Sequence, residues 1–149
     1  MKLIELLDEV KVILDSVPKI KETTICTMED MLIKVSEKKN MYMGAFVVYD
    51  QNNITVGEYS VTIPLSLFLV DKLRANMDNK IFIHSNTLSA SIDSISLLRV
   101  RINELGYDGL NDCVLDVWTE QFTDALLAGT KLDFTIQTDL KGFCDILTT

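Results

Sequence analysis

The first hydrophobic pattern along the chain has the period of an α-helix. Apolar residues recur every three or four positions near its start: Leu3, Leu6, Leu7, Val10, Ile13, Leu14 and Val17. This spacing predicts one buried helix face, and Pro18 ends the helix because a residue before proline is disfavoured in helical backbone. Residues 19–41 carry a weaker signal, in which EDMLIKVSEKK is compatible with a short second helix.

From residue 42 the pattern becomes that of β-strands. YMGAFVVY is apolar on both faces, as in a central strand, and DQNNITVG follows it with turn-forming residues. Apolar residues then alternate with polar ones over eleven positions, at Tyr59, Val61, Ile63, Leu65, Leu67 and Leu69. The alternation predicts a long half-buried strand that pairs with its predecessor as a hairpin. Pro64 lacks a backbone N–H, so we expect a sheet edge or a break in the strand there.

The segment 79–105 carries both helix and strand signals. KIFIHS has the residue types of a strand. The segment as a whole, however, has one apolar stripe at helical spacing. Its members are Ile81, Leu88, Ile95 and Ile102, seven residues apart, with Ile92, Leu98 and Leu105 beside them. We predict a helix from Thr87 to Leu105, with Gly106 as its C-cap, and leave open a start as early as Asn79.

Two further strands follow, CVLDVW and KLDFTIQT, the second with Leu132, Phe134 and Ile136 on one face. The order of elements predicts a single α+β domain over residues 1–149. We expect an antiparallel sheet of about four strands, in two hairpin-like pairs, with an N-terminal helix and one long central helix packed on it.

The stretch FTDALLAGTKLDFTIQTDL contains a glycine in a short run of small residues. A P-loop requires several glycines followed by Lys-Ser or Lys-Thr and then a helix, whereas Gly129 is followed by a strand pattern. We therefore interpret Gly129 as the start of a strand, with either a positive φ or a close approach of another backbone.

The residue types that usually carry catalysis are sparse. His84 is the single histidine, and Cys26, Cys113 and Cys144 lack the spacing of a disulfide framework or a zinc site, so we expect free thiols. Asp50 and Asp71 lie at predicted strand ends, where carboxylates are normally solvated. We predict no catalytic residues, no cofactor and no metal.

The acidic residues are concentrated late in the chain. The net charge is −8, and from Glu104 onward there are nine acidic residues and two lysines. Binding to phosphate backbones requires clustered Lys and Arg, so direct nucleic-acid binding is not expected. An acidic wall past which DNA slides without binding is compatible with this charge. No apolar run approaches the roughly 20 residues that span a bilayer, and the charged N-terminal segment does not have the pattern of a signal peptide.

Three features together resemble the neck and tail-completion ring proteins of tailed bacteriophages, especially the crAss-like phages of Bacteroides. The first is a long strand ending in aspartate and followed by a long helix, EYSVTIPLSLFLVDKLRANMDNKIFIHSNTLSASIDSISLL. The second is the block FTDALLAGTKLDFTIQT. The third is GFCDI near the end, although this chain continues with Ile146-Leu147 and lacks the proline of that family's close. The order of elements is also similar to that of tail terminator proteins.

The resemblance implies a non-enzymatic virion protein of the neck or tail, made in the host bacterial cytoplasm. Its partners would be copies of itself in a ring, together with portal-adaptor, neck or tail proteins, and DNA would pass through without specific binding. Interface candidates come from exposed strand edges and from aromatic anchors: Tyr59, Val61, Ile63, Trp118, Phe122, Asp124, Leu127 and Gly129. For Trp118 and Phe122, core packing is the competing interpretation. Asp133, Asp139 and Asp145 are the acids expected to face the bore.

Two other classes of function remain open at this stage. A cytoplasmic α+β adaptor or ligand-binding domain predicts a monomer or dimer with an apolar pocket. A small enzyme requires a pocket that joins His84 to a nucleophile, or two carboxylates of which one is buried.

Overall fold

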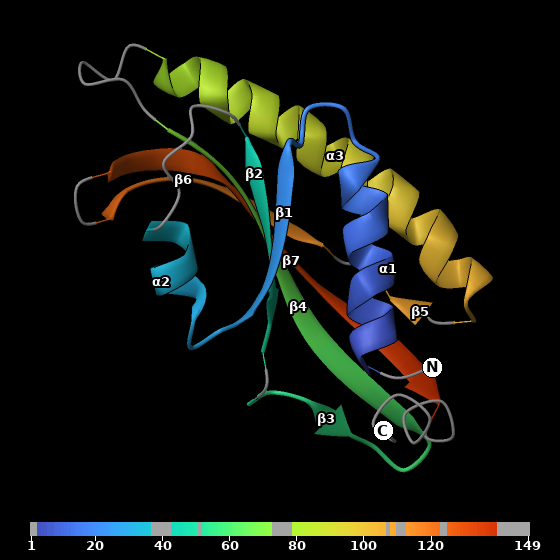
Figure 1. Ribbon diagram of the computed structural model, residues 1–149. Helices are drawn as coiled ribbons and strands as arrows, with labels where there is room; N and C mark the ends of the chain where they lie inside the picture. The colour runs from blue at the N-terminus through green and yellow to red at the C-terminus, as the bar shows by residue number, and fades with distance from the viewer. Residues whose placement is uncertain are drawn as a thin grey trace.

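The computed structural model describes residues 3–36, 43–50, 52–72, 79–106, 108–109, 113–122 and 125–139. Figure 1 shows a twisted sheet with two helices on one face and a short helix on the other. The elements are α1 (Leu3–Asp15), β1 (Glu22–Thr27), α2 (Met31–Ser36), β2 (Gly44–Tyr49), β3 (Thr55–Val56), β4 (Ser60–Lys72), α3 (Lys80–Glu104), β5 (Asp108–Gly109), β6 (Val114–Phe122) and β7 (Ala125–Asp139).

The two longest strands form the middle of the sheet. β4 and β7 pair antiparallel over thirteen positions, from Ser60 opposite Asp139 to Lys72 opposite Leu127. β2 and β3 pair with the other side of β4, while β6 and β5 pair with the other side of β7. β1 completes the described sheet by pairing parallel to β2. The α+β class is confirmed, but the sheet is mixed and has seven described strands, so the prediction of about four antiparallel strands was incomplete.

The alternation in β4 separates the two faces of the sheet. Val61, Ile63, Leu65, Leu67 and Leu69 are all buried, and Leu132, Phe134 and Ile136 of β7 lie on the same face, as predicted. α1 and α3 cover this face, to which they contribute Leu6, Leu7, Val10, Leu14, Ala90, Leu98 and Ile102. We call it the helix face. The main hydrophobic core lies between these helices and the sheet.

The opposite face, here the open face, holds a smaller apolar cluster. Its buried members are Cys26, Phe46, Val48, Phe68, Val70 and Leu127. Met31 of α2 and Met28 of the turn before α2 pack against this cluster. Figure 1 shows α2 on this side, at a distance from α1 and α3. This face is therefore only partly covered by the described elements.

Gly129 lies inside a strand and does not begin one, which corrects the prediction. It is the fifth residue of β7, opposite Val70 of β4 and Trp118 of β6. Gly106 is the glycine with positive φ in the described part of the chain, so the alternative of a close backbone approach applies at Gly129. A Cβ at this position would lie 1.8 Å from the carbonyl oxygen of Leu69. Only glycine fits between these strands without moving one of them.

Pro64 lies inside the sheet, at a point where one side of β4 is locally unpaired. On the β7 side it stands opposite Thr135, within the continuous ladder. On the other side the β2 ladder ends at Leu65 and the β3 ladder begins at Thr62, so that side has no strand residue opposite Pro64. The Asp50 N–H donates to the Pro64 carbonyl at 3.4 Å on this side. Because the N–H and C=O of one strand residue point to the same side, the N–H that Pro64 lacks would have pointed into this gap. The expectation that β4 is an edge strand was wrong, because a local gap is sufficient for the proline.

The long helix begins at the earlier of the two predicted positions. α3 runs from Lys80, so KIFIHS is helical, and Gly106 follows its end with φ of 82° while its N–H donates to the Asn103 carbonyl at 3.1 Å. The buried face differs from the predicted stripe. Its N-terminal half buries Ile83, Thr87, Ala90, Ser91 and Ser94, whereas Ile81, Leu88 and Ile92 are exposed.

Small and hydroxyl-bearing residues join α3 to the centre of β7. The hydroxyls of Ser91 and Thr130 share a buried hydrogen bond of 2.7 Å, and Ser91 also donates to the Thr87 carbonyl at 2.8 Å. Because these side chains are short and their polar atoms are paired, the helix can pack closely on the strand without leaving unpaired hydroxyls. The predicted residues Ile81, Leu88 and Ile92 do not make this contact, whereas Leu98 and Ile102 of the same predicted stripe are buried.

An ion pair joins α3 to α1 near the other end of the helix. Arg101 donates from Nη2 to Glu9 Oε1 at 2.9 Å and from Nε to Glu9 Oε2 at 3.0 Å. These two hydrogen bonds lower the pKa of Glu9 and raise that of Arg101. The pair fixes how the two helices lie on the helix face.

The close approach at Gly129 generates the first test. Gly129→Ala should destabilise the fold by about 1–3 kcal/mol, because an added methyl group forces β4 and β7 apart. Gly57→Ala is the matched control, since its Cβ would meet Ser60 at an ordinary 3.4 Å. Urea unfolding followed by circular dichroism measures both. Equal stability of Gly129→Ala and the parent would show that the approach of the two strands is looser than described.

Candidate functional site

His84 and the described cysteines lie far apart. Cys26 is buried on the open face, whereas His84 is on α3 over the helix face, so the sheet separates them. Cys113 directly precedes β6, so along β7 it lies near Phe134. His84 lies near Ala128 of β7, because its neighbour Ile83 contacts that residue. Six residues of extended strand separate those two levels, which is about 20 Å. Among the described residues, His84 and a cysteine do not form a catalytic pair.

The two predicted carboxylates, Asp50 and Asp71, lie in different parts of the sheet. Asp50 accepts hydrogen bonds from the Asn52 N–H at 3.2 Å and from Asn53 Nδ2 at 2.6 Å, so it organises the turn between β2 and β3. Asp71 lies seven positions along β4 from Pro64, near the other end of the strand. Asp50 and Asp71, both within the described residues, therefore lie too far apart to form the paired carboxylates of a glycosidase-like site.

Asp133 lies on the open face in a small polar cluster. Ser66 Oγ donates to its Oδ1, and Lys131 Nζ lies 3.6 Å from its Oδ2. The same ammonium group is 5.6 Å from the ring centroid of Phe68, a cation–π contact. A shallow hollow of about 360 Å³ adjoins the cluster and is lined also by Asp50, Pro64 and Thr135. About two-fifths of the Asp133 side chain is exposed, so this acid reaches the surface but already has partners.

The described residues provide neither a metal-binding cluster nor a helix suited to cross a membrane. Within those ranges no group of three or more His, Cys, Asp or Glu side chains is placed to hold a metal ion. None of the described helices has both the length and the apolar composition needed to cross a membrane.

Several predicted interface residues lie in the interior of the chain. Val61 and Ile63 are fully buried beneath the helices, and Leu127 is fully buried in the cluster of the open face. Gly129 lies between two paired strands. These four positions were chosen on the assumption that β4 and β7 have free edges. Because β4 and β7 pair with strands on both sides, neither has the free edge that was expected.

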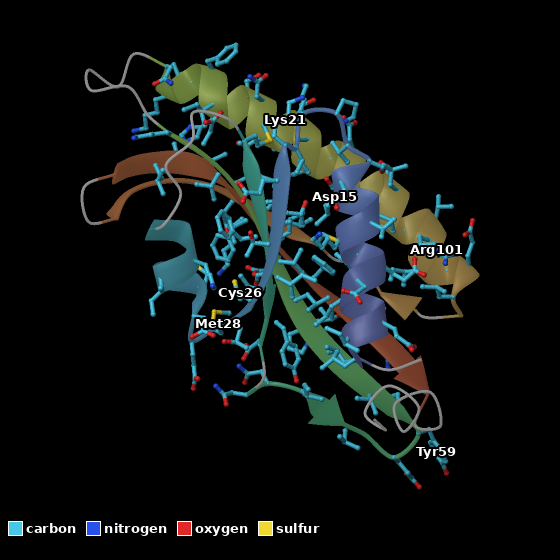
Figure 2. The ribbon with its side chains drawn as sticks, in the orientation of Figure 1. Asp15, Lys21, Cys26, Met28, Tyr59 and Arg101 are labelled. Carbon is cyan, nitrogen blue, oxygen red and sulfur yellow. The ribbon has the colours of Figure 1, made fainter. Side chains whose placement is uncertain are left out.

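Tyr59 remains a surface candidate. It lies in the turn between β3 and β4, where the Gly57 N–H donates to the Ser60 carbonyl at 2.7 Å, and 78% of the residue is exposed. Figure 2 shows Tyr59 at one extremity of the molecule. An aromatic side chain held out on a tight turn is well placed to contact another chain.

For Trp118 and Phe122 the structure gives the strand and the residue opposite each one. Both lie on β6, Trp118 opposite Gly129 and Phe122 opposite Ala125 at the closed end of the hairpin. Asp139 is the last residue of β7, opposite Ser60. Asp124 and Asp145 lie outside the described residues.

The free edges of the sheet differ from those predicted. In the described sheet, β1 pairs only with β2, and β6 pairs only with β7, so the outer sides of these two strands are free. They lie at opposite margins of the sheet. Main-chain hydrogen bonding with another chain is therefore possible at β1 and β6, instead of at β4 and β7.

The outer side of α3 is the surface that the sequence reasoning missed. Six of its large apolar residues are exposed: Ile81, Phe82, Leu88, Ile92, Leu97 and Val100. Between residues 81 and 98 the helix has one charged residue, Asp93. The low charge was a usable signal, because a helix that stays in water normally has charged residues on its outer side.

Comparison with known proteins does not assign this chain to a family. No protein-family model matches it, and the search of curated proteins found no significant similarity.

Cys26 provides a test of how closed the open face is. Burial, with a smaller contribution from the charge of Asp30, raises the pKa of its thiol, so the reactive thiolate forms only at higher pH than usual. With Cys113 and Cys144 replaced by serine, Cys26 should react with a disulfide reagent at pH 8 at least about tenfold more slowly than Cys113 does as the single remaining thiol. Equal rates would contradict the burial of this cluster.

Proposed function

We propose that this chain is a structural virion protein that forms part of a ring in the neck or tail connector of a tailed bacteriophage. In this role it joins portal or head-completion proteins to the tail and lines the passage for DNA. The observation that carries the proposal is the exposed apolar outer side of α3. Single exposed apolar residues are normal, but a group on one helix with almost no charge is typical of a surface that another protein covers.

The distribution of apolar surface supports assembly over catalysis. Exposed apolar residues are found on α3, on β6 at Val114 and Val117, and on the β3–β4 turn at Val56 and Tyr59. A ring of identical subunits needs two different contact surfaces on each copy, since each subunit meets one neighbour on either side. Several separate surfaces on one chain meet this requirement.

The free margins of the sheet provide contacts for other neck and tail proteins. A strand from a neighbouring protein can extend the sheet at β1 or at β6 through main-chain hydrogen bonds. β6 also carries Trp118 and Phe122, residue types that often anchor interfaces. In this proposal the aromatic hairpin of β6 and β7 contacts an adjacent layer of the neck.

The acidic final third fits a passage that does not retain DNA. Asp133 lies on the open face, and we propose that it faces the bore together with Asp139 and Asp145. Repulsion between carboxylates and phosphates keeps DNA from adhering, because tight binding depends on Lys and Arg that neutralise phosphates. The charge of Lys131 offsets part of this effect beside Asp133.

A cytoplasmic adaptor or ligand-binding domain is the second candidate. The hollow beside Asp133 is the observation that favours it, since it is lined by both polar and apolar residues. Its volume of about 360 Å³ is near the lower end of the range for small-molecule sites, and it is open to solvent. The ring proposal therefore has more support.

The proposed function predicts two results. Mass spectrometry of purified virions should detect the chain, and electron microscopy of the protein alone, or with its neck neighbours, should show rings. Phages with Asp133→Asn, Asp139→Asn and Asp145→Asn should assemble but eject DNA more slowly, because the neutralised wall no longer repels phosphate.

The control removes the same number of charges elsewhere. Asp8→Asn, Asp15→Asn and Glu29→Gln change exposed acids on α1 and in the turn before α2 and should leave ejection unchanged. Absence of the chain from virions, with a monomer at every concentration, would refute the ring. Unchanged ejection by the first triple variant would remove only the lumen assignment.

A further inference from the structure

Two exposed apolar surfaces lie at opposite ends of β4. At the start of the strand, the β3–β4 hairpin exposes Val56 and Tyr59. Beyond its other end, α3 begins and exposes Ile81 and Phe82, which are 82% and 67% accessible. The side chain of Asn79 donates to the Lys72 carbonyl at 3.4 Å, so the start of the helix is attached to the end of β4.

The length of β4 keeps these surfaces apart. Thirteen residues of extended strand span about 40 Å. Figure 1 shows β3 and the first turns of α3 at opposite ends of the molecule, and Tyr59 is labelled at the far end in Figure 2. The two surfaces cannot contact each other within one chain, but they can do so between copies.

Three of the six exposed apolar residues of α3 lie along one line of the helix. At about 100° per residue, Ile81, Leu88 and Ile92 fall within about 40° of each other around the helix axis. The buried positions, such as Thr87 and Ser94, lie roughly 120° away. We call Ile81, Leu88 and Ile92, with Phe82 beside the first of them, the α3 ridge. Ile81, Leu88 and Ile92 belong to the N-terminal part of the predicted stripe, whose later members Leu98 and Ile102 are buried.

The charges of the two surfaces are complementary. Glu58 is the only charged residue between positions 51 and 70, and it lies in the hairpin next to Tyr59. Lys80 is the only lysine or arginine between positions 79 and 98, and it lies next to Ile81 at the start of α3. Within the described ranges neither residue takes part in a salt bridge.

The net charge of the chain limits where a second copy can dock. Each copy carries a charge of −8, so two copies repel each other unless their contact pairs opposite charges. Contact between the hairpin and the start of α3 avoids this, because it places one carboxylate beside one ammonium group among apolar side chains. The chemistry of the ridge therefore fits a second copy of this chain.

We propose that the β3–β4 hairpin of one copy docks on the α3 ridge of the next copy. Val56 and Tyr59 pack against Ile81 and Phe82, and the Glu58 carboxylate pairs with the Lys80 ammonium. This contact rests on the proposed ring and specifies how its neighbouring subunits meet. Since the two surfaces are different and lie at opposite ends of β4, the contact is head-to-tail and repeats from copy to copy.

A charge exchange tests the contact directly. Glu58→Lys alone and Lys80→Glu alone should each weaken self-association at least about tenfold, because like charges then face each other. The variant that carries both changes restores opposite charges and should recover most of the association. Sedimentation velocity over a concentration series measures all three against the parent.

Matched reversals on other surfaces serve as controls. Asp8→Lys on α1 and Lys34→Glu on α2 change exposed residues of the same charges and should leave association within about twofold of the parent. Circular dichroism confirms that each variant is folded. Tyr59→Ser should also weaken association, because it removes the largest apolar group of the hairpin without changing the charge.

The outcomes separate this contact from the ring itself. Parent rings that are unaffected by either single reversal would overturn the docking contact and leave the ring in place. Failure of the doubly reversed variant to regain association would overturn the Glu58–Lys80 pairing. Open filaments that respond to the reversals as predicted would support the contact and refute the ring. A parent chain that stays monomeric alone and with its neck neighbours would overturn both.

Discussion

The fold depends on the close approach of β4 and β7 at Gly129. A side chain at that position would overlap the Leu69 carbonyl, so the thirteen-residue ladder between the two strands requires a glycine there. Every other described strand attaches to this central pair or to β2, which is itself paired with β4. The helices of the helix face also pack on it, with Thr130 next to Gly129 bonded to Ser91 of α3. The same pair of strands sets the distance between the hairpin and the start of α3.

Much of the fold could be predicted from the sequence, because periodicity reports burial directly. The alternation from Val61 to Leu69 corresponds to buried residues on one face of β4, and the spacing from Leu3 to Leu14 gave α1. β1 was missed because its sequence, ETTICT, is short and mostly polar, so it has no clear alternation. Its parallel partner, β2, is distant enough along the chain that no turn signal links the two strands.

The errors concern positions where a neighbouring backbone decides the outcome. The small residues around Gly129 look like a turn in the sequence, and only the position of Leu69 shows why they occur within a strand. Pro64 suggested an edge strand, since the sequence does not reveal that β2 ends at the residue before the gap. The row from Ile81 to Ile92 suggested a buried face, whereas the contact with β7 selects short hydroxyl side chains. Of the predicted interface residues, Tyr59 is the one whose described side chain is well exposed, and the α3 ridge was found only from the structure.

In the proposed assembly the protein acts through its outer surfaces at the two ends of a rigid strand pair. Disulfide trapping between copies tests this most directly. In a chain with Cys26→Ala, Cys113→Ala and Cys144→Ala, the added changes Tyr59→Cys and Phe82→Cys place one thiol on the hairpin and one beside the α3 ridge. Mild oxidation should give a ladder of covalent oligomers, and a mixture of the two singly substituted chains should give only the mixed dimer. A doubly substituted chain that remains monomeric, or singly substituted chains that link mainly to themselves, would contradict head-to-tail assembly.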